Sequence, residues 1–515
     1  MIAQAAIGFS LLLLLLAVIT GGSNQKYPNV PTLRVKTKEE DIQLYLKDVM
    51  ELLRVGYQKY SKQGRNYLLD LPKGKYFVAS HHYLDEIMRA PPSHVNAPDA
   101  QSIMTQTAYT ISAPVANDQW HMNVPVRKNL MLALTPSLEI IVAEARAYLD
   151  EQIGQPESTS VLASDFAFDI VVRTANRVLF GKQLARDPRW KRVCVEYSEV
   201  MFAGANKIRF YPNFLKRIAL WFTSDIRTVH KLAEECTFPV ISERLEKEQS
   251  FRQQGRDDTW EQTKPSDAIQ WVIDAAPQSE KTPNAILDRL LHITTATVHT
   301  TSFTFLDILH CLSLTKEYTE ELRTEITEVF RAEGGWSKQG LTHMAKVDSY
   351  VTEVTRWCPM SGLKLARLAL KDWTMKDGTL VPKGTIIFLN EKAIYDDEEI
   401  FDSPKTFNPW RMYQRRQKEG EAQKHQWVMA SPTHLHFGYS KHACPGRFFA
   451  SNEIKVLIAL LIMRYDVSAI GIPGGLAQVA QGYWGDNNRV PIMGVKLELK
   501  DRVSDIPTDI RQHFI

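Results

Sequence analysis

The sequence predicts a mainly α-helical protein with a smaller β portion, preceded by one transmembrane helix. Three observations support this fold class. Apolar residues recur at helical spacing over long stretches between residues 38 and 357. Short apolar runs separated by the turn sequences KDG and PKG follow between residues 363 and 390. Residues 2–20 contain no charged side chain.

Residues 1–22 are predicted to form a transmembrane anchor, because about 20 apolar residues suffice for a helix to cross a bilayer. A cleaved signal peptide is the alternative, since GGS follows the apolar run. Lys26 and further basic residues up to residue 38 follow the run, and this flank favours a retained anchor with the body on the cytoplasmic side. Residues 23–36 contain Pro28 and Pro31 and are expected to form a stiff connector.

Residues 37–515 are predicted to form a single domain. Thr282 and Pro283 mark the start of its longest helix, with threonine as N-cap and proline at the first helical position. The expected elements are, in order, a helix over 38–62, a hairpin within 67–79, an irregular segment over 90–117, helices to about 247, a polar linker over 246–267, helices over 283–314, 316–333 and 341–357, and strands within 363–390.

The composition excludes several functional classes. With 44% hydrophobic residues, 23% charged residues and a net charge of +3, the chain is an ordinary globular protein. No basic run is interleaved with aromatic residues, so we expect no nucleic-acid partner. The five cysteines form no CxxC pair, which argues against a disulfide framework and a structural zinc site and favours a reducing compartment.

Cys444 lies in the segment HFGYSKHACPGRFFA (436–450), directly before a run with helical periodicity. A cysteine at a helix start faces free backbone N–H groups and the positive end of the helix dipole, which favour the thiolate. Three interpretations compete: a structural cysteine, a nucleophile paired with His436 or His442, and a thiolate ligand of haem iron.

The segment FGYSKHACPG (437–446) resembles the haem-binding loop of the cytochrome P-450 family, FxxGx(R/H)xCxG. The resemblance implies Cys444 as the axial ligand of haem (heme, iron protoporphyrin IX), Phe437 as a haem contact and His442 as a ligand of a haem propionate. Ser440 replaces the family's usual second glycine, where a tight backbone is needed, so mild strain is expected there.

Two further motifs occur in the family's order. Glu353 and Arg356 form an E-x-x-R pair on a predicted helix, a pattern that by itself usually marks a solvated ion pair. FNPWR (407–411) resembles the family element FxPxR, which implies that Arg411 joins the pair in a buried network. Three buried charges are stable only if they hydrogen-bond to one another.

The helix over 283–314 contains ATVHTT (296–301), where the family has (A/G)Gx(D/E)T(T/S). The resemblance implies that Thr300, with Thr301, delivers protons to bound oxygen. The alternative is that these hydroxyls only bond back to helix carbonyls. His299 replaces the family's acid and is either a proton relay or a packed core residue.

Further propionate ligands are expected among basic residues. The family's early W-x-x-x-R motif is not kept in WHMNVPVR (120–127), so either His121 or Arg127 takes that role. Arg367 lies where members commonly place another propionate arginine. Pocket residues are expected from 91–117, 200–215, 292–304, 361–366 and 480–487.

The resemblance covers the whole chain and implies a membrane-anchored haem-thiolate monooxygenase with a cytochrome P-450 fold, whose haem-binding catalytic domain is residues 37–515. It would insert one atom of O2 into a lipophilic small molecule, a terpenoid or polyketide-type intermediate as in fungal members, in one or several oxidations. Electrons would come from NADPH-cytochrome P-450 reductase, docked on Lys441, Arg447, Arg127 and Lys128. The expected location is the endoplasmic reticulum membrane, facing the cytoplasm. The alternatives are an O2-independent isomerase or dehydratase and a non-catalytic haem-binding protein.

Overall fold

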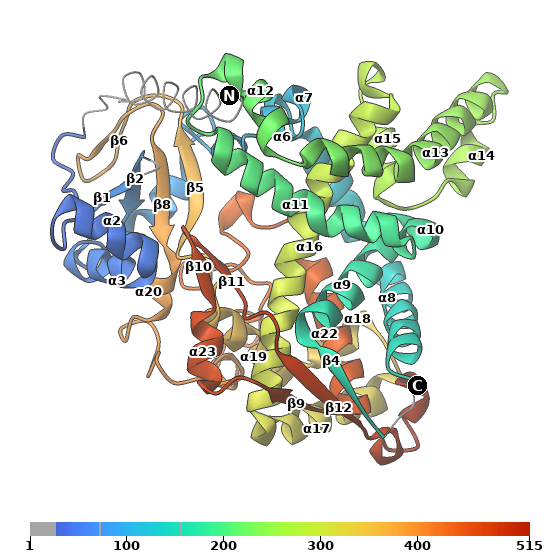
Figure 1. The fold of residues 1–515 in the computed structure, drawn as a ribbon. Coiled ribbons are helices and arrows are strands. Elements are labelled where there is room, and N and C mark those ends of the chain that lie inside the picture. The colour runs from blue at the N-terminus through green and yellow to red at the C-terminus, as the bar shows by residue number, and fades with distance from the viewer. Residues whose placement is uncertain (1–26, 72–73, 155–156) are drawn as a thin grey trace, which may run out of the picture.

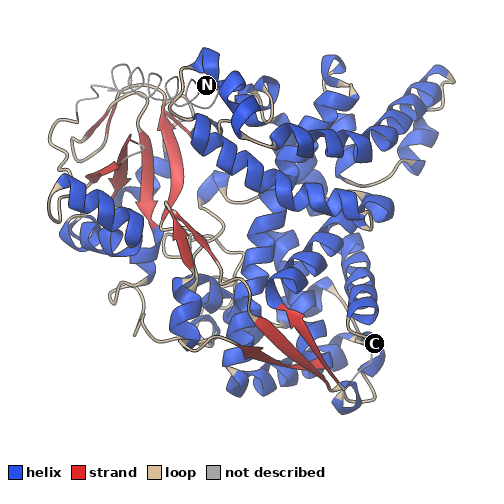
Figure 2. Ribbon diagram, in the orientation of Figure 1, coloured by secondary structure: helices blue, strands red, loops and turns tan. Residues whose placement is uncertain are grey.

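The computed structural model describes residues 27–71, 74–154 and 157–515. It has a helical body with a sheet-rich region along one side, so the predicted fold class is confirmed for this part of the chain (Figure 2). The predicted anchor, residues 1–22, and the start of the connector lie outside the described residues. Over the described ranges, no helix combines the length and apolar character needed to span a membrane.

The helical body is built from elements spread along the whole chain. Its helices are α2 (Lys38–Lys47), α3 (Val49–Lys59), α4 (Leu84–Arg89), α5 (Ala97–Thr105), α6 (Thr107–Thr110), α7 (Ala113–Asn117), α8 (Leu130–Gln152), α9 (Ala163–Leu179), α10 (Gly181–Ala185), α11 (Pro188–Ile208), α12 (Asn213–Thr223), α13 (Ile226–Gln253), α14 (Asp257–Thr263), α15 (Ala268–Ala275), α16 (Pro283–Leu314), α17 (Thr319–Glu333), α18 (Lys338–His343), α19 (Ala345–Trp357), α20 (Glu391–Tyr395), α21 (Arg411–Arg416), α22 (Arg447–Arg464) and α23 (Gly475–Gln481).

The strands form small sheets rather than one large one. The five-stranded sheet has the order β1-β2-β8-β5-β3, and β4-β12-β9, β10-β11 and β6-β7 form the others. Their bounds are β1 (Tyr67–Leu71), β2 (Gly74–Ala79), β3 (Val95–Asn96), β4 (Ser158–Leu162), β5 (Leu363–Ala369), β6 (Trp373–Thr374), β7 (Leu380–Val381), β8 (Ile386–Asn390), β9 (Tyr465–Ile470), β10 (Tyr483–Gly485), β11 (Asn488–Val490) and β12 (Lys496–Asp501).

Helix α16 runs through the centre of the body (Figure 1). It begins as predicted, because the Thr282 side chain accepts a hydrogen bond from the Ala285 N–H at 3.3 Å and Pro283 occupies the first helical position. Most of its apolar residues are buried in the main hydrophobic core, together with residues of α8, α9, α11 and α22. A second core lies against the five-stranded sheet and includes Phe77 and Ile387.

Several predicted element boundaries were wrong. The helix expected over 38–62 breaks at Asp48, which ends α2 and whose side chain caps α3 by accepting from the Glu51 N–H at 3.1 Å. The segment 90–117 is not irregular but holds α5, α6 and α7, because Asn96 caps α5 and starts it. The polar stretch 246–267 contains the end of α13 and all of α14, and the helix expected over 341–357 is preceded by α18.

Strand β5 carries a β-bulge that matters for the site. Its register against β8 shifts between Lys364 and Arg367. Leu365, inside the bulge, has a left-handed backbone with a φ of 59°. A bulge redirects the side chains that follow it, because it adds a residue to one strand only.

Candidate active site

The Cys444 loop joins a tight turn to the start of α22. The Cys444 N–H donates to the Phe437 carbonyl at 2.7 Å and closes the loop. Gly438 and Ser440 both have left-handed backbones, with φ of 78° and 61°. The strain predicted at Ser440 is therefore present, because the backbone keeps the conformation that suits glycine at this position.

Cys444 is partly buried, and its surroundings act on the pKa of its thiol in two directions. Burial raises the pKa and is the larger cause, while the N–H groups of Gly446 and Arg447 and the charges of Arg447 and Lys364 oppose it. The helix start alone therefore does not make a free thiolate here. A bound cation would stabilise the thiolate directly, which suits a metal ligand better than a free nucleophile.

A cavity of about 260 Å³ lies between the cysteine loop and α16. Its cysteine side includes Phe437, Cys444, Gly446 and Phe449. Its other wall is formed by α16, which contributes Ile293, Ala296, Thr297, Thr300, Thr301 and Thr304. The structure thus brings together the cysteine and the two threonines that the sequence singled out.

Thr300 lines this cavity with its hydroxyl already engaged by the helix. Its Oγ1 donates to the carbonyls of Ala296 at 3.0 Å and Thr297 at 3.3 Å. A hydroxyl that donates to the backbone keeps its lone pairs as acceptors toward the cavity. Thr300 is therefore placed both to bond back to the helix and to accept a hydrogen bond from a group in the cavity.

The basic residues predicted to bind propionates gather beside the loop. Arg367 is 5% exposed, and its guanidinium contacts the Ala366 carbonyl and the Met88 sulfur. No Asp or Glu of the described chain forms an ion pair with it, and burial lowers its pKa to about 10. A buried guanidinium without a carboxylate fits an anionic ligand.

His442 belongs to the same basic cluster. Its pKa is lowered to about 4, first by burial and then by the positive charges of Arg367, Lys441 and Arg127. Arg127 reaches the loop directly, since its Nη1 donates to the Lys441 carbonyl at 3.1 Å. The charges of two predicted propionate ligands from distant parts of the chain, Arg127 and Arg367, thus act on a third, His442.

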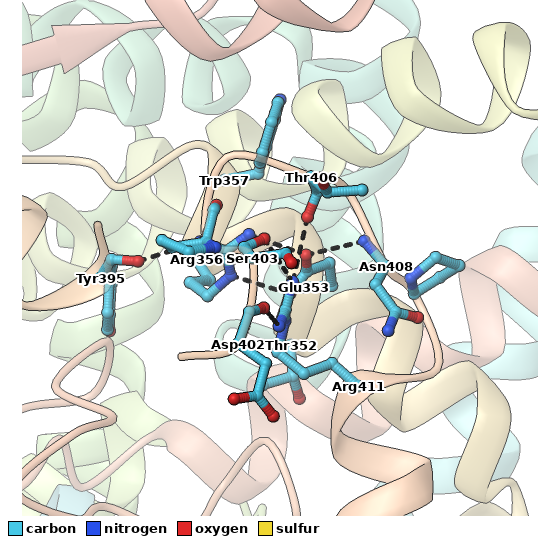
Figure 3. A network of polar contacts seen from close by, with 12 residues as sticks. Thr352, Glu353, Arg356, Trp357, Tyr395, Asp402, Ser403, Thr406, Asn408 and Arg411 are labelled. Atoms are coloured by element: carbon cyan, nitrogen blue, oxygen red, sulfur yellow. Dashed lines mark hydrogen bonds and ion pairs between the residues drawn. The ribbon is translucent and has the colours of Figure 1, made fainter. Parts of the chain in front are cut away.

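The predicted charge network is fully formed (Figure 3). Arg356 donates to both oxygens of Glu353 at 2.8 Å, and Arg411 Nε donates to Glu353 Oε2 at 3.2 Å. Glu353 is 0% exposed and Arg356 is 1% exposed. All three charges are therefore buried in mutual contact, as the sequence predicted.

The remaining donors of the network bind backbone carbonyls. Arg356 Nη1 donates to Tyr395 at 3.0 Å and to Pro404 at 2.9 Å, while Arg411 Nη2 donates to Thr406 at 3.0 Å. The network therefore ties α19 to the irregular segment that leads to the cysteine loop.

Comparison with known proteins decides the family. The family profile described as Cytochrome P450 matches residues 49–471. The chain belongs to the cytochrome P450 family. It is 32% identical to cytochrome P450 monooxygenase 151 of Postia placenta over 427 residues, covering 82% of this chain and 84% of that protein. It is 30% identical to cytochrome P450 monooxygenase AN1598 of Emericella nidulans, covering 87% and 82%, and to cytochrome P450 monooxygenase adrA of Penicillium rubens, covering 82% of each.

As a P450, the protein is a haem-thiolate monooxygenase that acts with O2 and a redox partner on a small molecule. The residues present fit the haem. Cys444 supplies a sulfur at the cavity wall, that wall is largely apolar, and Arg367 supplies a buried positive charge without an acidic partner among the described residues.

Five residues predicted for catalysis or haem binding are absent from the described lining of the cavity: His121, Arg127, His299, Arg367 and His442. His299 is not among the described residues that line the cavity. Its ring packs edge-on against Phe168 and Phe303, at centroid distances of 5.3 and 5.6 Å. Its Nε2 lies 3.6 Å from a Glu199 carboxylate oxygen. The packed-core alternative for His299 thus has direct geometric support.

His121 is fully buried and has protein partners at both ring nitrogens. Its Nε2 is 2.8 Å from His292 Nδ1, and its Nδ1 is 3.2 Å from Arg289 Nη1. Burial, together with His292 and Arg289, lowers its pKa to about 2. Arg127 is therefore the better placed of the two candidates for a propionate.

The lining agrees only in part with the pocket segments expected from the sequence. The segment 292–304 contributes as predicted, whereas 91–117, 200–215, 361–366 and 480–487 contribute none of the described lining residues. Sequence reasoning missed Met122, Leu179, Trp271 and Met360. Their only signal is apolar character, which they share with ordinary core residues.

Proposed function

We propose that this P450 oxidises a lipophilic small molecule of the terpenoid or polyketide-intermediate class, with Cys444 as the axial ligand of the haem iron. The observation that carries the proposal is the cavity in which Cys444 and Thr300 both lie. Its mainly apolar wall suits a greasy substrate. When bound, haem with a cysteinate ligand supplies the redox chemistry that cleaves O2 and inserts one oxygen atom.

The roles of the surrounding side chains follow from their positions. Arg367, His442 and Arg127 would bind the propionates as charge-assisted donors. Phe437 would pack against the ring, and the apolar residues of the cavity would exclude water and hold the substrate. Thr300 and Thr301 would hold and pass protons on the α16 side, with His299 as a more remote relay.

The test of the central role is the absorption spectrum of the dithionite-reduced protein with carbon monoxide, for the wild type and Cys444→Ser. We expect a strongly red-shifted Soret band in the wild type and its loss in the variant. A wild-type protein without haem, or with a Soret position typical of histidine ligation, would refute the proposal.

The test of Thr300 is the amount of product formed per NADPH consumed by Thr300→Ala. Loss of a positioned group that takes part in proton transfer lowers catalysis by roughly 10²-fold or more, so we expect a large fall in this ratio. Thr294→Ala is the matched control, because Thr294 bonds back to the Leu290 carbonyl at 2.9 Å in the same helix but does not line the cavity. Equal ratios in the two variants would remove Thr300 from the mechanism.

The alternative of an O2-independent isomerase or dehydratase predicts conversion of substrate without NADPH. The Thr300 hydroxyl at the cavity wall favours the oxygen-dependent reaction. Anaerobic incubation separates the two, since a monooxygenase forms no product without O2.

We also propose that the chain receives electrons from NADPH-cytochrome P-450 reductase, which would dock on the basic surface of Arg127, Lys128, Lys441 and Arg447.

We further propose that residues 1–22 hold the chain in the endoplasmic reticulum membrane. The aromatic side chains Phe214, Trp221 and Phe222 on α12 support membrane contact, since they are 78%, 59% and 81% exposed. Carbonate extraction tests the anchor: the full chain should stay with membranes and a chain lacking residues 1–22 should be released. Release of the full chain, or a mature N-terminus beyond residue 22, would refute it.

A further inference from the structure

Lys364 is a buried cation beside the cysteine loop. Its side chain is 14% exposed, and its Nζ donates to the His436 carbonyl at 3.0 Å. His436 directly precedes Phe437, whose carbonyl accepts from the Cys444 N–H. The ammonium therefore holds the backbone one residue before the group that closes the loop around the cysteine.

The bulge in β5 follows Lys364 and lets a second cation of the same strand, Arg367, reach the same loop. In a regular strand, residues three apart point to opposite faces. The register shift between Lys364 and Arg367 and the left-handed Leu365 change that alternation. Lys364 reaches the His436 carbonyl, and Arg367 consequently reaches the neighbourhood of His442.

The backbone at Leu365 costs free energy, because a non-glycine residue in the left-handed region is strained. Such strain persists where the surrounding structure needs the resulting geometry. Here the geometry delivers two cations to a single loop.

Lys364 is paired with an acid that is fully buried. Its Nζ lies 3.0 Å from Glu391 Oε2, and Glu391 is 0% exposed. The Tyr395 hydroxyl donates to Glu391 Oε1 at 2.9 Å and accepts from the Leu435 N–H at 3.0 Å. The ion pair therefore contacts the segment before the cysteine at two points, His436 and Leu435.

A buried ion pair is a poor source of stability, because desolvation offsets the attraction between the charges. Its position at the cysteine loop suggests another use. A positive charge near a redox centre favours the reduced state, and an uncompensated negative charge disfavours it.

We propose that Lys364, balanced by Glu391, is a positioning residue for the Cys444 ligand: it holds the loop through the His436 carbonyl and sets the reduction potential of the haem iron through its charge. The inference rests on the proposed role of Cys444. No other residue of the described chain was found to combine a buried charge with a bond to this part of the loop.

The experiment is a mediated dithionite titration of the ferric haem protein at pH 8, for the wild type, Lys364→Met and Glu391→Gln. Lys364→Met removes the positive charge that faces the loop, so we expect the equilibrium constant for one-electron reduction to fall by about threefold or more, about 28 mV at 59 mV per tenfold. Glu391→Gln leaves the ammonium uncompensated and should shift the potential by a similar amount in the opposite direction.

If the charges set the reduction potential, the two variants shift it in opposite directions. Simple damage to the loop would shift the potential of both variants in the same direction. Lys364→Arg keeps the charge and should stay near the wild type. Lys455→Met is the matched control, because Lys455 is also buried, pairs with Asp348 at 2.6 Å and donates to the Leu341 carbonyl at 2.9 Å. It should leave the potential unchanged.

Shifts of one sign, or shifts smaller than about threefold in both variants, overturn the inference. If Lys364→Met does not fold, the reduction potential of Glu391→Gln is compared with that of Lys364→Arg, and the same threefold criterion applies. The carbon monoxide spectrum of the wild type is recorded first, so failure of Cys444 ligation is detected independently of these potentials.

Discussion

Two of the E-x-x-R pairs of the described chain make the same bidentate contact, Glu51–Arg54 on α3 and Glu353–Arg356 on α19. Both arginines donate twice to their glutamate, at 2.7 Å in the first pair and 2.8 Å in the second. The side chains of Arg54 and Glu51 are 60% and 40% exposed, whereas those of Arg356 and Glu353 are 1% and 0% exposed.

The difference lies in what surrounds each pair. Around Glu353 the protein adds a second arginine, Arg411, and the Asn408 N–H, which donates to Glu353 Oε1 at 2.9 Å. The Glu51 carboxylate is instead open to solvent. An identical local motif is thus a surface ion pair in one region and the centre of a buried network in the other, because only tertiary packing decides its solvation.

The largest effect is expected from Glu353→Gln. The variant leaves two buried guanidiniums without their carboxylate, which costs about 3–5 kcal/mol. We expect a clear drop in the thermal unfolding midpoint and loss of haem during purification. A midpoint close to that of the wild type would mean that the network is not the structural unit that its contacts indicate.

Arg367→Leu extends the comparison to a buried charge without an acidic partner in the described chain. Removing it should weaken haem retention, because a hydrogen bond to a charged group contributes about 1.5–3 kcal/mol. The stability of the apo protein should stay the same or rise, since an unpaired buried charge is lost. Haem transfer to apomyoglobin and apo-protein melting measure the two effects. A lower apo stability with unchanged haem transfer would assign Arg367 a purely structural role.

Glu453 extends the comparison to a buried acid without a cationic partner among the described residues. Burial raises its pKa from 4.5 to about 8, while the Thr174 hydroxyl, which donates to it at 2.6 Å, opposes the shift. In the unfolded chain the Glu453 carboxyl ionises near pH 4.5, so unfolding releases a proton between about pH 4.5 and 8. The free energy of unfolding therefore falls as pH rises through this range, by about 1.4 kcal/mol per pH unit.

The measurement for Glu453 is the difference in melting temperature between the wild type and Glu453→Gln across this pH range. The wild type should lose stability relative to the variant as pH rises. A difference that does not vary with pH would show that Glu453 ionises normally in the folded protein.

The smallest effect is expected from Glu51→Gln. An exposed pair at this helical spacing contributes about 0.2–0.5 kcal/mol, less in high salt. The melting temperature should change by about a degree and the haem content not at all. A loss comparable to that of Glu353→Gln would break the comparison, because burial would then not be the deciding factor.

Local sequence determined the elements whose causes are local. The α16 helix has the predicted bounds because Thr282 and Pro283 specify its start within two residues. The cysteine loop, the E-x-x-R pair at Glu353 and the haem-thiolate class follow from short motifs whose order along the chain agrees with one family. Each of these depends on neighbouring residues, so the sequence alone was sufficient.

Tertiary structure decided everything that depends on which surfaces meet. It buried one E-x-x-R pair and left the other in water, turned His299 onto Phe168 and Phe303, and gathered Arg127, Arg367 and His442 beside one loop. The bulge at Leu365 lets Lys364 and Arg367 reach the same loop, and no local pattern predicts it. The physical reason is that solvation and long-range charge contacts are properties of packed neighbours distant in the chain, whereas caps and turns are properties of adjacent residues.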